Sequence, residues 1–549
     1  MSEPNLQSIA FPILDDAQIA ELGQCTAAEP GSYKDGQTLV QVGQRDFPLF
    51  IVKSGEIEVI DYSGDEPRTV TVHQKGGFTG DVSHMTGAPS VVGLVARGDS
   101  EVYEISRDAV RHVLNQCPTF SDILLQAFIA RRQLLRESPD FTGLRVIGSR
   151  YSQDTFRVRD FLARNRVLFT WMDVESDPHV DQLLKEFGLI EDDTPVVACS
   201  HRVLMRNPTN RQLADALGIR RPLEQTLYDM VVVGAGPAGL AAAVYGASEG
   251  LRTLVVDSTA PGGQAGSSMR IENYLGFPTG LTGAELTDRA ILQANKFGAR
   301  LSVPTLVTRL EFDNGYPIVH LDGGEAVTTK CLLVTTGAEY RRLNVEGFEQ
   351  FEGAGVYYAA TPSEGRLCRG AQVVVVGGGN SAGQAAVFLA QHARKVLLLI
   401  RGDDLYKNMS TYLVRRIEQT PNIDLLSNTT IHRMVGDGHL SCIGILNSRT
   451  GEERSVETAA VFSFIGTMPR TNWLPPEIER DDKGFVRTGS DLVQFSHGSA
   501  RRHPHFLETS RPGVFAAGDV RSGSVKRVAA AVGEGAMAVQ FVHEYLKDL

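Results

Sequence analysis

The chain has 549 residues and a formal net charge of −11, from 54 Lys and Arg residues against 65 Asp and Glu residues. At roughly 150 residues per domain, this length predicts three or four domains. The acidic balance and the lack of a basic block argue against a protein built to bind nucleic acid. Hydrophobic residues at 42% and charged residues at 22% are typical of globular domains and exclude coiled-coil, collagen-like and disordered chains.

The N-terminal segment MSEPNLQSIAFPILDD has neither the basic start nor the long apolar core of a secretory signal. No run of about 18 apolar residues occurs, so we expect no membrane span. The six cysteines are scattered and form no CxxC pair, which favours a reducing, cytoplasmic setting. They are Cys25, Cys117, Cys199, Cys331, Cys368 and Cys442.

Residues 1–139 alternate short apolar stretches with turns and then change to a helical pattern. The clearest stretch is LFIVKSGEIEVIDYSGDEPRTVTV, in which Ser54-Gly55 and Ser63-Gly64 mark turns. Apolar residues then recur at helical spacing over 123–135. The segment therefore predicts a small β-barrel or jelly roll followed by a helix.

This segment resembles the cyclic-nucleotide-binding domain family through Lys53-Ser54-Gly55-Glu56-Ile57-Glu58-Val59 and Gly80-Asp81-Val82. In that family a glutamate after the glycine holds the ribose, and an arginine nine residues later pairs with the cyclic phosphate. Here Asp81 replaces the glutamate and Ser90 stands where the arginine is expected. Because a buried phosphate without its guanidinium loses a strong charge-assisted bond, we expect the fold without the family's nucleotide binding. A retained nucleotide ligand is one alternative, and a docking or dimerisation module with the 123–135 helix as its interface is another.

Residues 140–222 alternate strands and helices. The pattern predicts strands at 144–148, 168–173 and 196–200 and helices at 155–164, 179–187 and 210–217. This order resembles the thioredoxin and glutaredoxin fold, with Thr194-Pro195 at the position of the family's cis-proline. The dithiol position reads Ser149-Arg150-Tyr151-Ser152-Gln153-Asp154-Thr155, without cysteine. Because thiol–disulfide exchange needs an attacking thiolate and a resolving thiol, we expect a structural or partner-recognition role.

The third segment opens on a glycine-rich cradle. An apolar strand at 230–233 leads into Gly234-Ala235-Gly236-Pro237-Ala238-Gly239, a helical run and a second strand that ends at Asp257, 23 residues after Gly234. In such a unit the glycines permit a tight turn, close approach of a pyrophosphate and close helix packing, while the acid binds a ribose. The pyrophosphate meets the N-terminus of the helix. The segment predicts a Rossmann-like dinucleotide site.

A second cradle follows at Gly377-Gly378-Gly379-Asn380-Ser381-Ala382, after the apolar strand 373–376. At the position that matches Asp257 the chain has Ile400, followed by Arg401. A carboxylate at this position would repel a 2′-phosphate, whereas an apolar residue and a cation do not. The second site is therefore predicted to bind NADPH rather than NADH.

Residues 224–549 resemble the thioredoxin-reductase-like flavoproteins, through both cradles, Gly262-Gly263-Gln264, Ile271-Glu272-Asn273-Tyr274, Ile465–Thr471 and Gly518-Asp519. The resemblance implies an FAD domain at 223–340 and 471–549, an NADPH domain at 341–470 and a homodimer. The FAD residues it implies are Gly234, Gly236, Pro237, Ala238, Gly239, Asp257, Gly263, Gln264, Asn273, Thr336, Gly337, Gly518, Asp519, Arg527 and Val528. The NADPH residues are Gly377, Gly379, Asn380, Ser381, Ala382, Arg401 and Gly466.

The resemblance also shows departures. Arg527 matches an arginine near the flavin ring, but Val528 replaces the glutamine that usually follows it. The family's His-Arg-Arg triplet for the 2′-phosphate is reduced to Ile400-Arg401-Gly402, with Lys407 as a loosely spaced substitute. The family's CxxC is absent from the equivalent stretch 355–365, and the nearby Cys368 is interpreted as a small core residue.

These features predict a multidomain flavoenzyme: a β-barrel or jelly roll, a thioredoxin-like α/β domain and two Rossmann-like domains. Hydride transfer from NADPH to FAD needs only stacking and alignment, so it survives loss of the dithiol. Electrons must then pass from the flavin directly to an external acceptor, and the sequence identifies no catalytic side chain.

Three alternatives stay open: a thioredoxin-disulfide reductase with a disulfide outside any motif, a ferredoxin or flavodoxin reductase, and a sensor of the nicotinamide pool. The stretch Arg501-Arg502-His503-Pro504-His505 is predicted to be an exposed polar loop rather than a metal site, because no carboxylate or cysteine completes a ligand set.

Overall fold

The computed structural model describes residues 6–25, 28–62, 66–81, 84–85, 89–137, 144–199, 202–220, 223, 227–268, 270–360, 362–492 and 503–549. The predicted turn at Ser63-Gly64, Val82 of the first resemblance, and Arg501-Arg502 lie outside these residues. Within them, no helix is both long and apolar enough to cross a membrane.

The N-terminal unit is an antiparallel β-structure followed by two helices, where the sequence predicted one. Its sheet has the order β1-β5-β3-β4, with β2 paired to β5. The helix expected over 123–135 is longer and is preceded by a separate helix that the sequence pattern did not distinguish. The elements are α1 (Leu6–Ala10), α2 (Asp16–Cys25), β1 (Glu29–Tyr33), β2 (Thr38–Val40), β3 (Leu49–Asp61), β4 (Arg68–His73), β5 (Gly93–Ile105), α4 (Arg107–Gln116) and α5 (Pro118–Glu137).

The second unit contains every strand and helix predicted for it and one further strand, β9. Its sheet has the order β7-β6-β8-β9, in which β6 is parallel to β7 and antiparallel to β8. The Thr194-Pro195 peptide is cis. The elements are β6 (Leu144–Ile147), α6 (Gln153–Arg164), β7 (Phe169–Met172), α7 (Val180–Glu186), β8 (Val196–Cys199), β9 (Arg202–Arg206) and α8 (Asn210–Ala216).

The third unit is built on a large sheet with the order β12-β11-β10-β15-β14-β13, to which β26 adds beside β15. Strands β10, β11, β12, β15 and β26 run parallel. Apolar residues of β10 and β15 pack into a core cluster on each face of the sheet, as is typical of parallel sheets covered on both sides. The elements are β10 (Leu227–Val233), α9 (Pro237–Ser248), β11 (Thr253–Val256), α10 (Gly283–Lys296), β12 (Arg300–Ser302), β13 (Val307–Asp313), β14 (Tyr316–Leu321), β15 (Ala326–Val334), β26 (Val514–Ala516) and α15 (Val528–Lys547).

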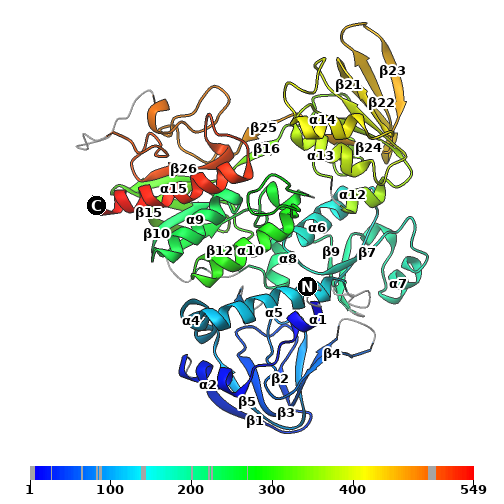
Figure 1. Ribbon diagram of the computed structural model, residues 1–549. Helices are drawn as coiled ribbons and strands as arrows, with labels where there is room; N and C mark the ends of the chain where they lie inside the picture. The colour runs from blue at the N-terminus through cyan, green and yellow to red at the C-terminus, as the bar shows by residue number, and fades with distance from the viewer. Residues whose placement is uncertain are drawn as a thin grey trace.

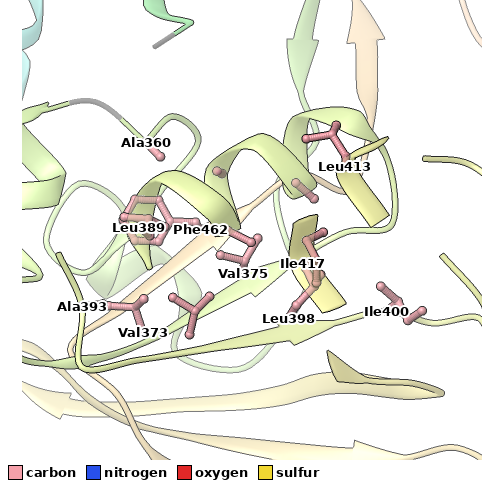
Figure 2. Packing of buried hydrophobic residues seen from close by; sticks show 14 of the residues in the cluster. Ala360, Val373, Val375, Leu389, Ala393, Leu398, Ile400, Leu413, Ile417 and Phe462 are labelled. Carbon is pink, nitrogen blue, oxygen red and sulfur yellow. The ribbon is translucent and has the colours of Figure 1, made fainter. Parts of the chain in front are cut away.

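The fourth unit has a parallel sheet of order β17-β24-β18-β19-β20 and a three-stranded antiparallel sheet, β21-β22-β23. Its core packs α13 and α14 against the strands, and Figure 2 shows Val375, Leu398 and Phe462 of neighbouring strands beside Ile417 of α14. The elements are α11 (Phe348–Phe351), β17 (Val356–Tyr357), α12 (Pro362–Leu367), β18 (Gln372–Val376), α13 (Asn380–Leu389), β19 (Lys395–Leu399), α14 (Thr411–Glu418), β20 (Ile423–Leu426), β21 (Thr429–Asp437), β22 (His439–Asn447), β23 (Glu453–Glu457) and β24 (Ala460–Ser463).

The chain passes from the third unit to the fourth and back through two short strands, β16 (Ala338–Tyr340) and β25 (Thr467–Pro469), here called the crossing strands. These two strands pair as an antiparallel sheet. In Figure 1 the second unit lies between the N-terminal unit and the fourth unit, with α6 close to the crossing. Helices α4 and α5 contact α10 of the third unit: Asn115 of α4 donates to the carbonyl of Lys296, and the Lys296 side chain donates to Ser121 of α5.

Candidate dinucleotide-binding site

The first glycine cradle joins β10 to α9. Gly234 adopts a φ of +110°, where a side chain would be strained, and a β-carbon there would strike the backbone of Thr335. Gly236 is the N-cap of α9, and no side chain caps this helix, whereas hydroxyl side chains cap α6 and α10. The free N–H groups of α9 are therefore available to an anion.

Asp257 is placed at the end of β11 by hydrogen bonds to the cradle and to the turn that follows it. Its Oδ2 accepts from the backbone N–H of Ala235 at 2.9 Å. Its Oδ1 accepts from the N–H groups of Thr259 at 2.9 Å and Ala260 at 3.1 Å. The carboxylate therefore fixes the turn at 258–260 relative to the glycine cradle.

A cavity of about 660 Å³ opens at this cradle and extends to the crossing strands and the fourth unit. Most of the residues predicted for FAD line it, together with two predicted for NADPH. They are Gly234, Gly236, Pro237, Ala238, Asp257, Gly263, Gln264, Thr336, Gly337, Gly518, Asp519, Arg527 and Val528 from the first set, and Ser381 and Gly466 from the second.

Two residues of the predicted FAD set do not line the cavity. Gly239 serves packing instead, because a β-carbon there would strike the carbonyl of Gly234 and the side chain of Thr335. Asn273 is exposed on the loop between Ile271 and Leu281, which pair as an isolated β-bridge. The structure thus does not bring Asn273 to the cavity, contrary to the expectation from sequence.

The crossing strands add charged and aromatic residues that sequence reasoning missed. Arg470 pairs with Glu339 and donates to Ser258 Oγ at 3.2 Å. Burial raises the pKa of the Tyr340 hydroxyl, which lies in the same cavity. Their only sequence signal is their position at the two crossings between units.

Arg164, the last residue of α6, also lines the cavity, although it belongs to the second unit. Nothing in the sequence indicated that this helix would reach the dinucleotide cradle, because the contact depends on how separate units dock. The other newly found lining residues include Lys526, just before Arg527.

Asp519 lines the cavity together with other charged residues. Burial raises the pKa of its carboxyl, Lys526 opposes the rise and Glu534 adds to it. Glu534 itself is buried, accepts from the N–H of Gly518 at 2.7 Å, and pairs with Arg521 at 2.6 Å. This pair holds the Gly518-Asp519 turn in place.

The second cradle has the same construction at the N-terminus of α13. Gly379 is the N-cap without a side-chain cap, and a β-carbon there would meet no atom within 4 Å. Gly377 adopts a φ of +140° against Phe464. Asn380 accepts from Ser410 N–H at 2.7 Å, and Ala382 is buried in the core, so both support the cradle rather than line the cavity.

Ile400 and Arg401 lie at the end of β19, as the sequence predicts. Ile400 is buried in the core of the fourth unit (Figure 2), and its Cγ2 would lie 3.7 Å from a β-carbon on Gly378. Arg401 is exposed and forms no ion pair within the described part of the chain. Lys407 pairs with Asp403 at 2.8 Å.

None of the five cysteines whose side chains the structure describes forms a disulfide. Cys331 is fully buried in β15, and Cys368 is buried in the core of the fourth unit, among different neighbours. Burial, with Glu364 nearby, raises the pKa of the Cys368 thiol to about 12. Because the thiolate is the reactive form, Cys368 is inert at neutral pH.

The N-terminal unit has a separate cavity of about 290 Å³, lined by both Asp81 and Ser90. Ser90 is buried and donates its hydroxyl hydrogen to the carbonyl of Val92 at 2.7 Å. Asp81 forms an ion pair with Arg132 at 3.7 Å. The two positions that the family uses for ribose and phosphate are thus engaged within the protein.

Within 503–505, His503 is exposed in an irregular segment as predicted, whereas His505 is half-buried. Its ring stacks on Phe541 of α15 at 5.5 Å, and its Nδ1 lies 3.3 Å from Glu544. His505 therefore fastens the chain before β26 to the C-terminal helix.

The geometry fits two dinucleotides. Both helices that follow the cradles begin without a side-chain cap, Gly236 and Gly379 leave open space, and one cavity reaches both.

Residues 228–535, a little over half of the chain, match the family described as "Pyridine nucleotide-disulphide oxidoreductase". The chain belongs to this family. Members of the pyridine nucleotide-disulphide oxidoreductase family typically bind FAD and NAD(P)H.

Thioredoxin reductases are among the proteins that the chain resembles. The chain is 35% identical over 325 residues to the enzyme of Treponema pallidum and 31% identical over 327 residues to that of Bacillus subtilis, covering 59% of this chain and 99% and 97% of those enzymes. Crystal structures of the enzymes from Lactococcus lactis (27% identity) and T. acidophilum (30%) each superpose with a TM-score of 0.53. They cover 59% and 58% of this chain and 100% and 99% of theirs.

These likenesses make the protein a thioredoxin-reductase-like flavin oxidoreductase and confirm it as an enzyme. Residues 30–117 match the cyclic nucleotide-binding domain family, which confirms the resemblance of the N-terminal unit.

Proposed function

We propose that the protein is an FAD-dependent NADPH oxidoreductase that passes electrons from the flavin directly to an external acceptor. One observation carries the proposal. The stretch 355–365, where the thioredoxin-reductase-like enzymes carry their dithiol, contains no cysteine, and the nearest thiol, Cys368, is buried and protonated at neutral pH.

The residues that line the large cavity would hold FAD. The N–H groups at the start of α9 bind its phosphates, Asp257 its ribose, and Asp519 its ribityl chain, while Gln264 is fixed beside the crossing strand by a bond to the carbonyl of Ala338. When bound, FAD supplies two-electron chemistry between a nicotinamide and the acceptor.

The second cradle would hold NADPH. Ile400 presents no carboxylate to a 2′-phosphate, and Lys407 is engaged by Asp403. Arg401 is exposed at the same strand end and makes no ion pair with any residue the structure describes. A free guanidinium beside an apolar side chain favours the phosphorylated coenzyme.

The remaining units would have supporting roles. We infer a cyclic-nucleotide-binding-like domain at 1–139 that lacks the family's nucleotide affinity, because Asp81 and Ser90 are engaged internally. We infer a thioredoxin-like domain at 140–222 from the sheet order and the helices of the second unit. The FAD domain spans 223–340 and 471–549, the NADPH domain spans 341–470, and the assembly is a homodimer.

An acceptor screen on purified, flavin-loaded protein tests the proposal. Rapid NADPH consumption with a quinone and none with thioredoxin disulfide is the expected result. Thioredoxin turnover that disappears in the Cys331→Ser/Cys368→Ser variant would establish the hidden-disulfide enzyme instead. Turnover with ferredoxin or flavodoxin alone would identify that acceptor class, and tight NADPH binding without turnover would identify a sensor.

A further inference from the structure

The C-terminal end of α6 forms part of the wall of the FAD cavity. Arg164, the last residue of the helix, lines this cavity beside residues of the third unit and of the crossing strands. The second unit, which has no dithiol, therefore contributes a cation to a site that its own fold does not contain.

Two contacts beside Arg164 hold the end of α6 in place. Asn165 donates from Nδ2 to the carbonyl of Thr259 at 3.0 Å, in the same turn whose N–H groups bind Asp257. Arg166 donates from Nε to Asp288 on α10 at 2.8 Å. Because Asn165 and Arg166 directly follow Arg164, their two contacts fix the backbone of Arg164 relative to the glycine cradle.

Of the four other cations that line the cavity, two arginines have acidic partners, whereas Lys526 and Arg527 form no ion pair within the described residues. Arg470 pairs with Glu339, and Arg342 pairs with Glu352 at 3.1 Å. The guanidinium of Arg164, in contrast, makes no hydrogen bond within the described residues, and its single ion pair is with Asp160 at 3.8 Å.

Arg164 also lies close enough to Arg470 to disfavour its charge. Burial lowers the pKa of the Arg470 guanidinium, Asp257 opposes this, and Arg164 adds to it. Because Arg470 is paired with Glu339, Arg164 is the guanidinium of this corner without a close carboxylate, and an anionic ligand could pair with it.

We propose that Arg164 completes the FAD site by pairing with the phosphate groups of the dinucleotide, so that the second unit is a structural part of the flavin site. The proposal rests on the proposed function, since it requires FAD in the large cavity. It gives the second unit a role that needs no cysteine.

The test measures FAD release from flavin-loaded, full-length protein, followed as the recovery of flavin fluorescence after dilution. Arg164→Gln is expected to release FAD about 10-fold faster, since a charge-assisted bond contributes roughly 1.5 kcal/mol or more. Arg164→Lys should restore part of the loss, because it keeps the charge without the planar fork. Arg206→Gln, which removes an exposed arginine of the same unit paired with Asp193, should release FAD at the wild-type rate.

Salt and coenzyme measurements show whether the charge of Arg164 acts on FAD itself. Raising the ionic strength should speed FAD release more in the wild type than in Arg164→Gln, and KM for NADPH should stay unchanged. Wild-type release rates in a folded Arg164→Gln variant, or a raised KM for NADPH with unchanged FAD release, would overturn the inference alone. A wild-type protein that does not bind FAD would overturn the proposed function with it.

Discussion

Arg166 donates a hydrogen bond from Nε to Oδ1 of Asp288 at 2.8 Å, across the boundary between the second and third units. The carbonyl of Arg166 also accepts from Arg132 of α5 at 2.8 Å, so three units meet at this residue. The two paired side chains are mostly shielded, with exposures of 18% and 28%, which makes the pair stronger than a surface salt bridge.

We predict that this pair couples the stabilities of the two units. A double-mutant cycle with Arg166→Ala and Asp288→Ala should give an interaction energy of about 1–2 kcal/mol. Urea unfolding followed by tryptophan fluorescence measures this interaction energy. The protein has two tryptophans, Trp171 in the second unit and Trp473 in the third, so each unit carries one fluorescent reporter. The exposed pair Arg309–Glu311 of the third unit, with exposures of 59% and 47%, serves as control and should give less than about 0.5 kcal/mol. Equal coupling in both pairs would contradict a special role for Arg166.

Glu534 should be important for stability as well as for FAD binding. Glu534→Gln removes the charge that pairs with buried Arg521 and weakens the bond to Gly518, so it should lower the free energy of unfolding by about 3 kcal/mol. Glu349→Gln, at an exposed glutamate of α11, should change it by less than about 0.5 kcal/mol. Urea denaturation of both variants checks this, and an unaffected Glu534→Gln would show that the turn is held by other contacts.

The N-terminal unit should lose stability in mild acid because His73 is buried as the neutral form. Burial, aided by Arg131, lowers the pKa of His73 from 6.5 to about 3. Between these values the unfolded chain binds more protons than the folded chain, so stability falls as the pH drops below about 6.5. The loss should reach about 2 kcal/mol at pH 5.

Calorimetric melting between pH 7 and pH 5 measures this effect. The transition of the N-terminal unit should move to lower temperature in the wild type and move less in His73→Gln. Burial also lowers the pKa of His84, so a smaller residual shift is expected in that variant. A shift of the same size in both proteins would contradict the assignment to His73.

Arg401 should determine the choice of coenzyme. Arg401→Ala should lower kcat/KM for NADPH about 10-fold and change the value for NADH by less than about twofold, because only the 2′-phosphate pairs with the guanidinium. Arg454→Ala, which removes an exposed arginine of β23, should leave both values unchanged. Equal losses with both coenzymes would place Arg401 outside the phosphate site.

The features that the sequence predicted are local ones. Both cradles could be read from glycines such as Gly234 and Gly377, since each stands between an apolar strand and a helix within a few residues, although the backbones they approach, at Thr335 and Phe464, are distant in sequence. The second unit was predictable strand by strand except for β9. The sequence of β9, Arg-Val-Leu-Met-Arg, is short and has arginine at both ends, so it does not indicate a strand by itself. The strand forms by antiparallel pairing with β8.

The features that the sequence missed arise from docking between units. Arg164 reaches the FAD cavity only because Asn165 and Arg166 fasten α6 to the third unit, and these contacts span about 90 to 120 residues. Asn273 was expected at the cavity by resemblance, but its loop turns outward, where Glu272 pairs with Arg416 of α14 at 3.4 Å.

Electrons are proposed to leave the flavin without an internal dithiol. An anaerobic titration of flavin-loaded protein with dithionite, followed by the flavin absorbance, tests this most directly. One equivalent of dithionite per FAD should complete the reduction, because none of the described cysteines, including Cys368, forms a disulfide. A second equivalent consumed per FAD, and lost in the Cys331→Ser/Cys368→Ser variant, would reveal a redox-active disulfide and contradict the direct route.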